Sequence, residues 1–163
     1  DLIVFASSSG GTQAGLVVGA RAWNFSGQIL GISVDKGERS PKPYEQDLAE
    51  LASSTAVLLG LHERFSEDDF WVDYDYLGEG YGVLGERERE AILLLARTEG
   101  LLLDPVYTGK AMGGLIDMVR RGLLGGSKTV LFWHTGGGPA LFAYARELLY
   151  DPLGDRETAS ADL

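Results

Sequence analysis

The 163-residue chain contains no cysteine, which excludes a disulfide framework, a cysteine-ligated metal and a thiol nucleophile. Its only histidines are His62 and His134, too few for a histidine-rich metal site, and we expect no bound metal. No uncharged apolar run approaches the ~18 residues of a membrane helix, and no signal-peptide pattern precedes the first predicted strand. We therefore expect a cytoplasmic protein with no membrane partner.

Basic residues are also scarce. The chain has 14 lysines and arginines and 24 aspartates and glutamates, which gives a net charge of −10 at pH 7. Nucleic-acid phosphates would be repelled over most of such a surface, so we expect no nucleic-acid partner. Apolar residues make up 45% of the chain, enough for one compact domain that buries roughly 70% of its unfolded surface. Glycine is abundant instead, at 23 residues, and its positions are informative.

Apolar runs and helical patterns alternate in the first third of the chain. A strand, a helix, a strand and a helix are predicted in this order: residues 2–6, 12–23, 28–34 and 44–59. This order implies a parallel sheet with right-handed crossovers. Gly15 and Gly19 are expected to leave a smooth stripe on the first helix for close packing on the sheet.

The rest of the chain is less regular but continues the same alternation. We predict loops at 36–43 and 63–69, strands at 70–74 and 128–133, helices at 86–98 and 109–121, an extended segment at 101–107, and a final helix that Pro139 opens. The fold class is therefore α/β, a parallel-rich open sheet flanked by helices. Residues 1–150 are expected to form the domain and residues 151–163 a solvated tail.

Two glycine-rich loops, Ser8–Thr12 and His134–Gly138, each follow an apolar strand and precede a helix. In an open parallel sheet this places both at the carboxyl edge, where ligands bind. Backbone N–H groups at a helix N-terminus bind anions, and the hydroxyls of Ser9 and Thr12 can add hydrogen bonds. The first loop therefore predicts a phosphate site, with a tight turn that needs glycine only for its dihedral angles as the alternative.

The first loop fits neither of two common phosphate signatures. Gln13 follows Thr12 where a Walker A loop requires Gly-Lys-Ser/Thr, and the glycine spacing differs from G-x-G-x-x-G. Asp35, however, ends the second predicted strand roughly 20 residues beyond the loop, where a ribose-binding carboxylate would lie. A nucleotide-binding module therefore stays open, with an exposed loop carboxylate as the simpler interpretation of Asp35.

Three motifs in order resemble one enzyme family: Ser8-Ser9-Gly10-Gly11-Thr12-Gln13-Ala14-Gly15, the segment 99–112 with its Tyr107-Thr108-Gly109-Lys110, and His134-Thr135-Gly136-Gly137. Together they are similar to the D-cysteine desulfhydrase and 1-aminocyclopropane-1-carboxylate deaminase family, pyridoxal-phosphate enzymes of the tryptophan-synthase-β fold. The resemblance covers residues 1 to about 150 and implies the C-terminal half of a longer protein. Because the lysine that carries the cofactor in this family lies in the N-terminal half, we expect the chain alone to be inactive.

The resemblance also implies roles for individual residues. Four would hold the phosphate of pyridoxal 5'-phosphate, mostly through backbone N–H groups: Ser9, Gly10, Gly11 and Thr12. Thr135 would place its hydroxyl against the pyridine nitrogen. Tyr81 and Tyr107 would flank a small amino-acid substrate as catalytic residues. We expect the complete protein to be a homodimer.

Thr108 and Thr135 bear on the substrate. The family members that open the cyclopropane ring resemble Tyr-Glu-Gly-Lys at the first position and have leucine at the second, whereas both threonines resemble the desulfhydrase branch. A carboxylate at Thr108 would favour a protonated ring nitrogen. We therefore expect a lyase that converts D-cysteine to pyruvate, hydrogen sulfide and ammonia by β-elimination. Ring-opening deamination to 2-oxobutyrate and ammonia is one alternative, and a non-catalytic nucleotide- or phosphate-binding module is the other.

Two further side chains have simpler interpretations. Lys110, near the start of a predicted helix, is expected to be a solvated surface lysine. His134 follows an apolar strand and is expected to be a hydrogen-bonded core histidine rather than a catalytic base.

Overall fold

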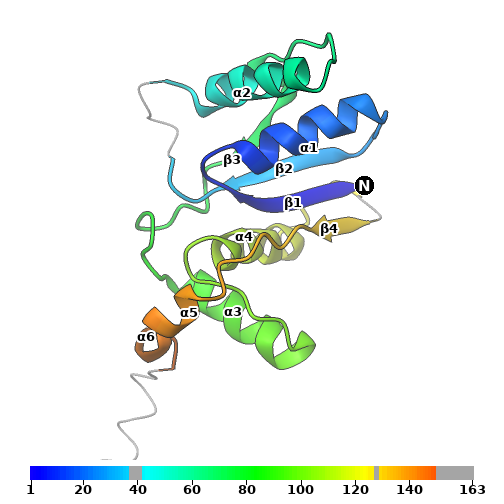
Figure 1. Ribbon diagram of the computed structural model, residues 1–163. Helices are drawn as coiled ribbons and strands as arrows, with labels where there is room; N and C mark the ends of the chain where they lie inside the picture. Colours follow the sequence, from blue (N-terminus) through cyan, green and yellow to red (C-terminus); the bar gives the residue numbers. More distant parts are fainter. Residues whose placement is uncertain (37–41, 127–128, 150–163) are drawn as a thin grey trace, which may run out of the picture.

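A computed structural model of the chain describes residues 1–36, 42–126 and 129–149. Its strands form one parallel sheet in the order β3-β2-β1-β4 (Figure 1). They are β1 (Leu2–Ser7), β2 (Gln28–Ser33), β3 (Trp71–Asp73) and β4 (Val130–Phe132). Leu2 pairs with Gln28 on one side and Val130 on the other, so β4 directly neighbours β1. The predicted open parallel sheet is confirmed.

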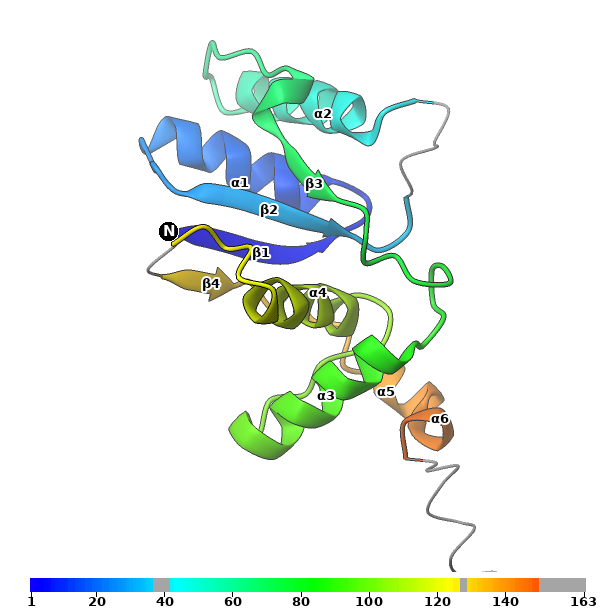
Figure 2. The ribbon, with the colours of Figure 1, turned by 180° about the vertical axis from the view of Figure 1, so that it is seen from behind.

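Helices cover both faces of this sheet. The helices of the described residues are α1 (Gly11–Ala22), α2 (Tyr44–Leu58), the 3-10 turn η1 (Glu67–Asp69), α3 (Glu86–Glu99), α4 (Thr108–Arg120), α5 (Ala140–Ala143) and α6 (Ala145–Leu149). Figure 1 shows α1 and α2 on one side of the sheet and α4 with α3 on the other, and Figure 2 shows the same layers from behind. In place of the predicted final helix there are two short helices, α5 and α6, separated by Tyr144.

Some predictions fall beyond the described residues. These are most of the loop at 36–43, the first residue of the strand at 128–133, and the tail at 151–163. The segment predicted to be extended, 101–107, holds no strand and ends in a turn that leads into α4.

Apolar side chains pack on both faces of the sheet because successive strand residues point to opposite sides. On one face Val4 and Ile32 are fully buried against α4, where Ala111 is also fully buried. On the other side α1 packs on α2, through contacts that include Val18 and Leu48. Fully burying such side chains stabilises the fold by ~1.5–3 kcal/mol each, which anchors α1 and α4 at the carboxyl edge of the sheet.

The predicted glycine stripe on α1 does not pack on the sheet. A β-carbon at Gly15 or Gly19 would meet no atom within 4 Å, since both positions face away from the core. The buried residues of α1 are Gln13, Ala14, Val17 and Val18. The prediction was wrong because helical spacing alone does not distinguish the face that packs from its neighbour.

Within the described ranges, no helix is long and apolar enough to cross a membrane. The same residues contain no cluster of three or more histidine, cysteine, aspartate or glutamate side chains placed to hold a metal ion.

Candidate functional site

The two glycine-rich loops lie next to each other because they follow adjacent parallel strands, β1 and β4, whose carboxyl ends share one edge of the sheet. A pocket of about 230 Å³ lies between them. It is lined by Ala6, Ser7, Ser8, Ser9, Gly10, Thr12, Gln13, Tyr107, Thr135, Gly136 and Gly137. No lining side chain carries a charge at neutral pH, so a bound anion would meet hydroxyls and backbone groups rather than a carboxylate.

Gly10 shapes the first wall of this pocket. Its φ of 90° is left-handed, and a β-carbon there would lie 2.8 Å from Cδ2 of Leu48. Both the backbone conformation and the close approach to α2 therefore require glycine. Gly10 also stands at the N-cap of α1, where no side chain caps the helix. The first N–H groups of α1 therefore remain available for an anion, as at other helix N-termini.

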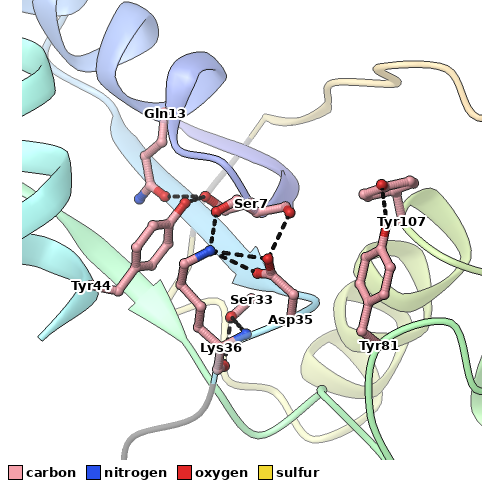
Figure 3. Close-up of polar contacts among 9 residues, drawn as sticks. Ser7, Gln13, Ser33, Asp35, Lys36, Tyr44, Tyr81 and Tyr107 are labelled. Atoms are coloured by element: carbon pink, nitrogen blue, oxygen red, sulfur yellow. Dashed lines mark hydrogen bonds and ion pairs between the residues drawn. The ribbon is translucent and has the colours of Figure 1, made fainter. Parts of the chain in front are cut away.

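A buried polar network supports the loop from behind (Figure 3). Ser7 Oγ donates to Oε1 of Gln13 at 2.7 Å and lies 2.9 Å from the Tyr44 hydroxyl. Because Ser7 has one proton and gives it to Gln13, Tyr44 must donate to Ser7. Burial raises the pKa of Tyr44 to about 12, so the phenol keeps the proton that this bond requires.

Gln13 extends the network to the far strand, since its Nε2 donates to the carbonyl of Trp71 at 2.9 Å. Gly31 makes room for it, because a β-carbon at this position in β2 would lie 2.3 Å from Oε1 of Gln13. The first turn of α1 is thus fixed to three strands by one fully buried amide side chain.

Asp35 is exposed, as its simpler interpretation predicted, but its carboxylate is bonded to the first loop. Its Oδ2 accepts from Ser8 Oγ at 2.9 Å and pairs with Nζ of Lys36 at 3.0 Å (Figure 3). Lys36 also donates to the carbonyl of Ser8 at 2.5 Å. A ribose hydroxyl would have to displace these partners, which disfavours Asp35 as a nucleotide ligand.

Asp104 organises the second wall, and sequence reasoning missed it. Its fully buried carboxylate accepts from the backbone N–H groups of Val106 and Tyr107 through Oδ2, both at 2.8 Å. Oδ1 accepts from the N–H and the hydroxyl of Thr108, at 2.8 and 2.7 Å. These bonds fix the start of α4 and with it Tyr107. An aspartate followed by a proline ahead of a helix is a turn signature that would have identified it, because aspartate side chains accept from backbone N–H groups two residues on.

Thr108, the first residue of α4, is bonded to Asp104 in the turn before the helix. Besides donating to Asp104, its hydroxyl accepts from the Asp104 N–H at 2.9 Å, and its side chain is fully buried. It does not line the pocket. Position 108 therefore supplies no carboxylate to the pocket.

Tyr81 and Tyr107 meet through their hydroxyl groups (Figure 3). Their rings are 5.8 Å apart and edge-on, with an interplanar angle of 73°. The bond to Tyr81, followed by burial, raises the pKa of Tyr107 to about 12. At neutral pH Tyr107 therefore keeps its proton and presents a phenol to the pocket that it lines.

The structure gathers most of the predicted site residues around this pocket. Those that line it are Ser9, Gly10, Thr12, Tyr107 and Thr135. Gly11 does not line it but opens α1, while Tyr81 is 54% exposed and reaches the site only through Tyr107.

The expected exposure of Lys110 and the expected burial of His134 were both wrong, whereas the expected hydrogen bonding of His134 is confirmed. Lys110 is fully buried rather than solvated, and its ammonium has three oxygen partners. His134 is exposed rather than in the core, although both ring nitrogens are bonded. Its Nδ1 accepts from the Gly136 N–H at 3.1 Å, so the proton lies on Nε2, which donates to the Leu102 carbonyl at 3.0 Å.

Comparisons with known proteins identify the family to which the chain belongs. Residues 1–136 match the family described as "Pyridoxal-phosphate dependent enzyme". The chain is similar to the 1-aminocyclopropane-1-carboxylate deaminases of Burkholderia vietnamiensis, at 42% identity, and Ralstonia nicotianae, at 43%. Each alignment covers 145 residues, 89% of this chain and 42% of the relative. The chain therefore spans less than half the length of these relatives.

A solved structure described as "Crystal Structure Analysis of the ACC deaminase homologue" is also similar. The two match with a TM-score of 0.78 at 36% identity, over 91% of this chain and 43% of that one.

Proposed function

Because this chain belongs to the pyridoxal-phosphate dependent enzyme family, we propose that its pocket holds the phosphate and the ring of pyridoxal 5'-phosphate. The observation that carries the proposal is that loops from two adjacent strand ends line one pocket. One loop offers uncapped helix N–H groups and the other offers a hydroxyl.

The residues present fit the phosphate end of the cofactor. A phosphate dianion is favoured at the N-terminus of α1, where N–H groups and the helix dipole both attract negative charge. Ser9 and Thr12 line the same end and add hydroxyl donors. The glycine at position 10 leaves no side chain between the anion and the backbone.

Thr135 would face the other end of the cofactor, where a neutral hydroxyl leaves the pyridine nitrogen without a carboxylate partner. When bound, pyridoxal phosphate supplies an electron sink that weakens the bonds to the α-carbon of an amino acid. Tyr107 adds a protonated hydroxyl at the pocket wall, positioned by Asp104 and Tyr81, to deliver or relay a proton to the substrate.

For the overall reaction we propose ring-opening deamination, in which 1-aminocyclopropane-1-carboxylate and water give 2-oxobutyrate and ammonia. The support is that the similar curated relatives carry the name of this activity. This reading replaces β-elimination as the first candidate.

A second candidate remains, β-elimination from D-cysteine, in which substrate and water give pyruvate, hydrogen sulfide and ammonia. The specific observation that favours it is the absence of a carboxylate among the lining residues, because Thr135 is neutral and the Thr108 hydroxyl is used by Asp104. A ring nitrogen that is not held protonated suits elimination, which needs less complete withdrawal of electrons into the ring.

Product analysis tests these candidates. The natural full-length protein is incubated with pyridoxal phosphate and each substrate in turn, and 2-oxobutyrate, pyruvate and sulfide are measured. We expect 2-oxobutyrate from the cyclopropane substrate. Sulfide and pyruvate from D-cysteine without 2-oxobutyrate would establish the second candidate. A colourless protein that is stabilised by a nucleotide would refute both and restore the binding-module interpretation.

A further inference from the structure

The ammonium of Lys110 is one of the few fully buried charges in the described part of the chain. Its Nζ donates to the carbonyl oxygens of Leu77 and Val83, at 2.9 and 3.1 Å, and lies 3.2 Å from Oε1 of Glu88. An ammonium has three protons, so all of its donors are used. Burying a charge is costly unless it is paired and hydrogen-bonded, and this one is both.

The two carbonyl groups stand on either side of the glycine-rich segment 78–82. Three glycines in this segment have left-handed backbone conformations: Gly78 at φ 66°, Gly80 at 137° and Gly82 at 73°. Glycine loses more conformational freedom on folding than any other residue, so such a segment needs external contacts to remain in one conformation. Lys110 supplies such contacts at both ends.

Glu88 completes the arrangement. Its side chain is only 3% exposed, and Oε2 accepts from the N–H of Gly85 at 2.9 Å while Oε1 faces Lys110. Glu88 lies in the first turn of α3 and Lys110 in the first turn of α4. One buried ion pair therefore joins the starts of both helices to the segment between Leu77 and Val83.

That segment carries Tyr81, whose hydroxyl is bonded to Tyr107. Tyr107 lies immediately before α4 and precedes Lys110 by three residues, so the start of this helix positions both the partner of Tyr81 and the ammonium that holds the segment carrying Tyr81. We propose that Lys110 and Glu88 are positioning residues that hold Tyr81 against Tyr107 at the pocket. This inference rests on the proposed function for the role of the tyrosine pair. The tether, meaning the bonds from Lys110 to the carbonyl groups of Leu77 and Val83, can be tested without turnover.

The first test is limited proteolysis of the natural full-length holoenzyme with chymotrypsin, with the cut after Tyr81 identified by mass spectrometry. Lys110→Met keeps the apolar stem and removes the ammonium, so the loop should open more often and be cut at least about tenfold faster. The control is Glu90→Gln, which breaks the exposed ion pair to Arg120 between the same two helices and should leave the rate unchanged. Equal rates in all three proteins would overturn the tether.

The second test asks whether Lys110 acts through Tyr81. We expect Lys110→Met to lower kcat at least about tenfold by misplacing the tyrosine, with KM and cofactor absorbance much less affected. In a Tyr81→Phe background the same substitution should change kcat less than twofold, since the bond between the tyrosines is already gone. Multiplicative losses would contradict a positioning role. If Tyr81→Phe alone leaves kcat unchanged, the role of the pair in the proposed function fails, and proteolysis still decides the tether.

A double variant distinguishes loss of the tether from misfolding of the protein. Lys110→Met leaves the Glu88 carboxylate buried without its partner, whereas Lys110→Met combined with Glu88→Gln removes both charges and keeps an acceptor for the Gly85 N–H. The double variant should unfold at a temperature nearer to that of the native protein and still show the faster cut after Tyr81. Native-like resistance to chymotrypsin in the folded double variant would overturn the proposal.

Discussion

Gly137 packs directly against the buried carboxylate of Asp104, so closely that a β-carbon at this glycine would lie 2.4 Å from Cγ and Oδ1. The loop after β4 is thereby joined to the turn that precedes α4, since the same carboxylate holds the backbone of Tyr107. The two walls that this contact connects carry Thr135 and Tyr107, both of which line the pocket.

The first prediction follows from this contact. Gly137→Ala should destabilise the protein by at least about 2 kcal/mol, because the φ of 93° is left-handed and the new carbon meets Asp104. Cofactor retention should fall with it. Gly138→Ala is the matched control, since a β-carbon there meets nothing within 4 Å. Thermal unfolding and visible absorbance measure both effects, and equal behaviour of the two variants would refute the account of this wall.

The phosphate loop offers a similar pair of neighbours. Gly10→Ala combines a left-handed φ of 90° with a carbon 2.8 Å from Leu48, while Gly11→Ala adds a carbon with no neighbour within 4 Å. The first substitution should cost about 1–3 kcal/mol and weaken cofactor binding. The second should leave both nearly unchanged. Equilibrium dialysis against pyridoxal phosphate compares them, and a larger loss in Gly11→Ala would show that the loop is assigned incorrectly.

Asp104 should matter more for stability than its position in a turn suggests. Asp104→Asn replaces one accepting oxygen by a donor that faces backbone N–H groups, so we expect a loss of about 1–3 kcal/mol in the free energy of unfolding. Asp47→Asn, at an exposed carboxylate paired with Lys42, should cost only ~0–1 kcal/mol. Urea denaturation distinguishes the two variants. Comparable unfolding midpoints would show that the buried hydrogen bonds of Asp104 contribute no more to stability than the exposed ion pair.

Alkaline pH should weaken the fold in part through Tyr44. Burial raises its pKa from 10.0 to about 12 in the folded protein, so its stabilising contribution is complete below pH 10 and is lost as the pH rises through 12. Tyr44→Phe should therefore lower the free energy of unfolding at pH 7, because Ser7 loses a partner. Between pH 10 and 12, however, the stability of this variant should decline less steeply than that of the native protein. Chemical denaturation at a series of pH values measures both declines, and equal slopes would contradict the buried phenol.

The sequence predicted the sheet and the approach of its two loops because both depend on local patterns. Apolar runs marked β1 and β2, glycines marked the turns after β1 and β4, and parallel topology brings such turns to one edge. Lys110 and Gln13 were not predicted as buried residues. Nothing local reveals the partners of Lys110, which lie 22 to 33 residues away, or the Trp71 carbonyl, which lies 58 residues from Gln13.

The remaining differences between the predictions and the structure have other causes. Asp104 is followed by a proline, which is a local turn signature, so its role in the turn before α4 was predictable from the sequence. The outward direction of Gly15 and Gly19 depends on how α1 rotates against the sheet, which the buried side chain of Gln13 fixes. The exposure of His134 depends on the loop that follows β4 and not on the strand that precedes it.

The most direct test of the central claim is a crystal structure of the natural full-length protein grown with pyridoxal 5'-phosphate. We expect the phosphate on the N–H groups at the start of α1, within hydrogen-bond distance of Ser9 or Thr12, and the pyridine nitrogen beside the hydroxyl of Thr135. A phosphate bound elsewhere, or a ring that lies away from the loop after β4, would contradict this claim.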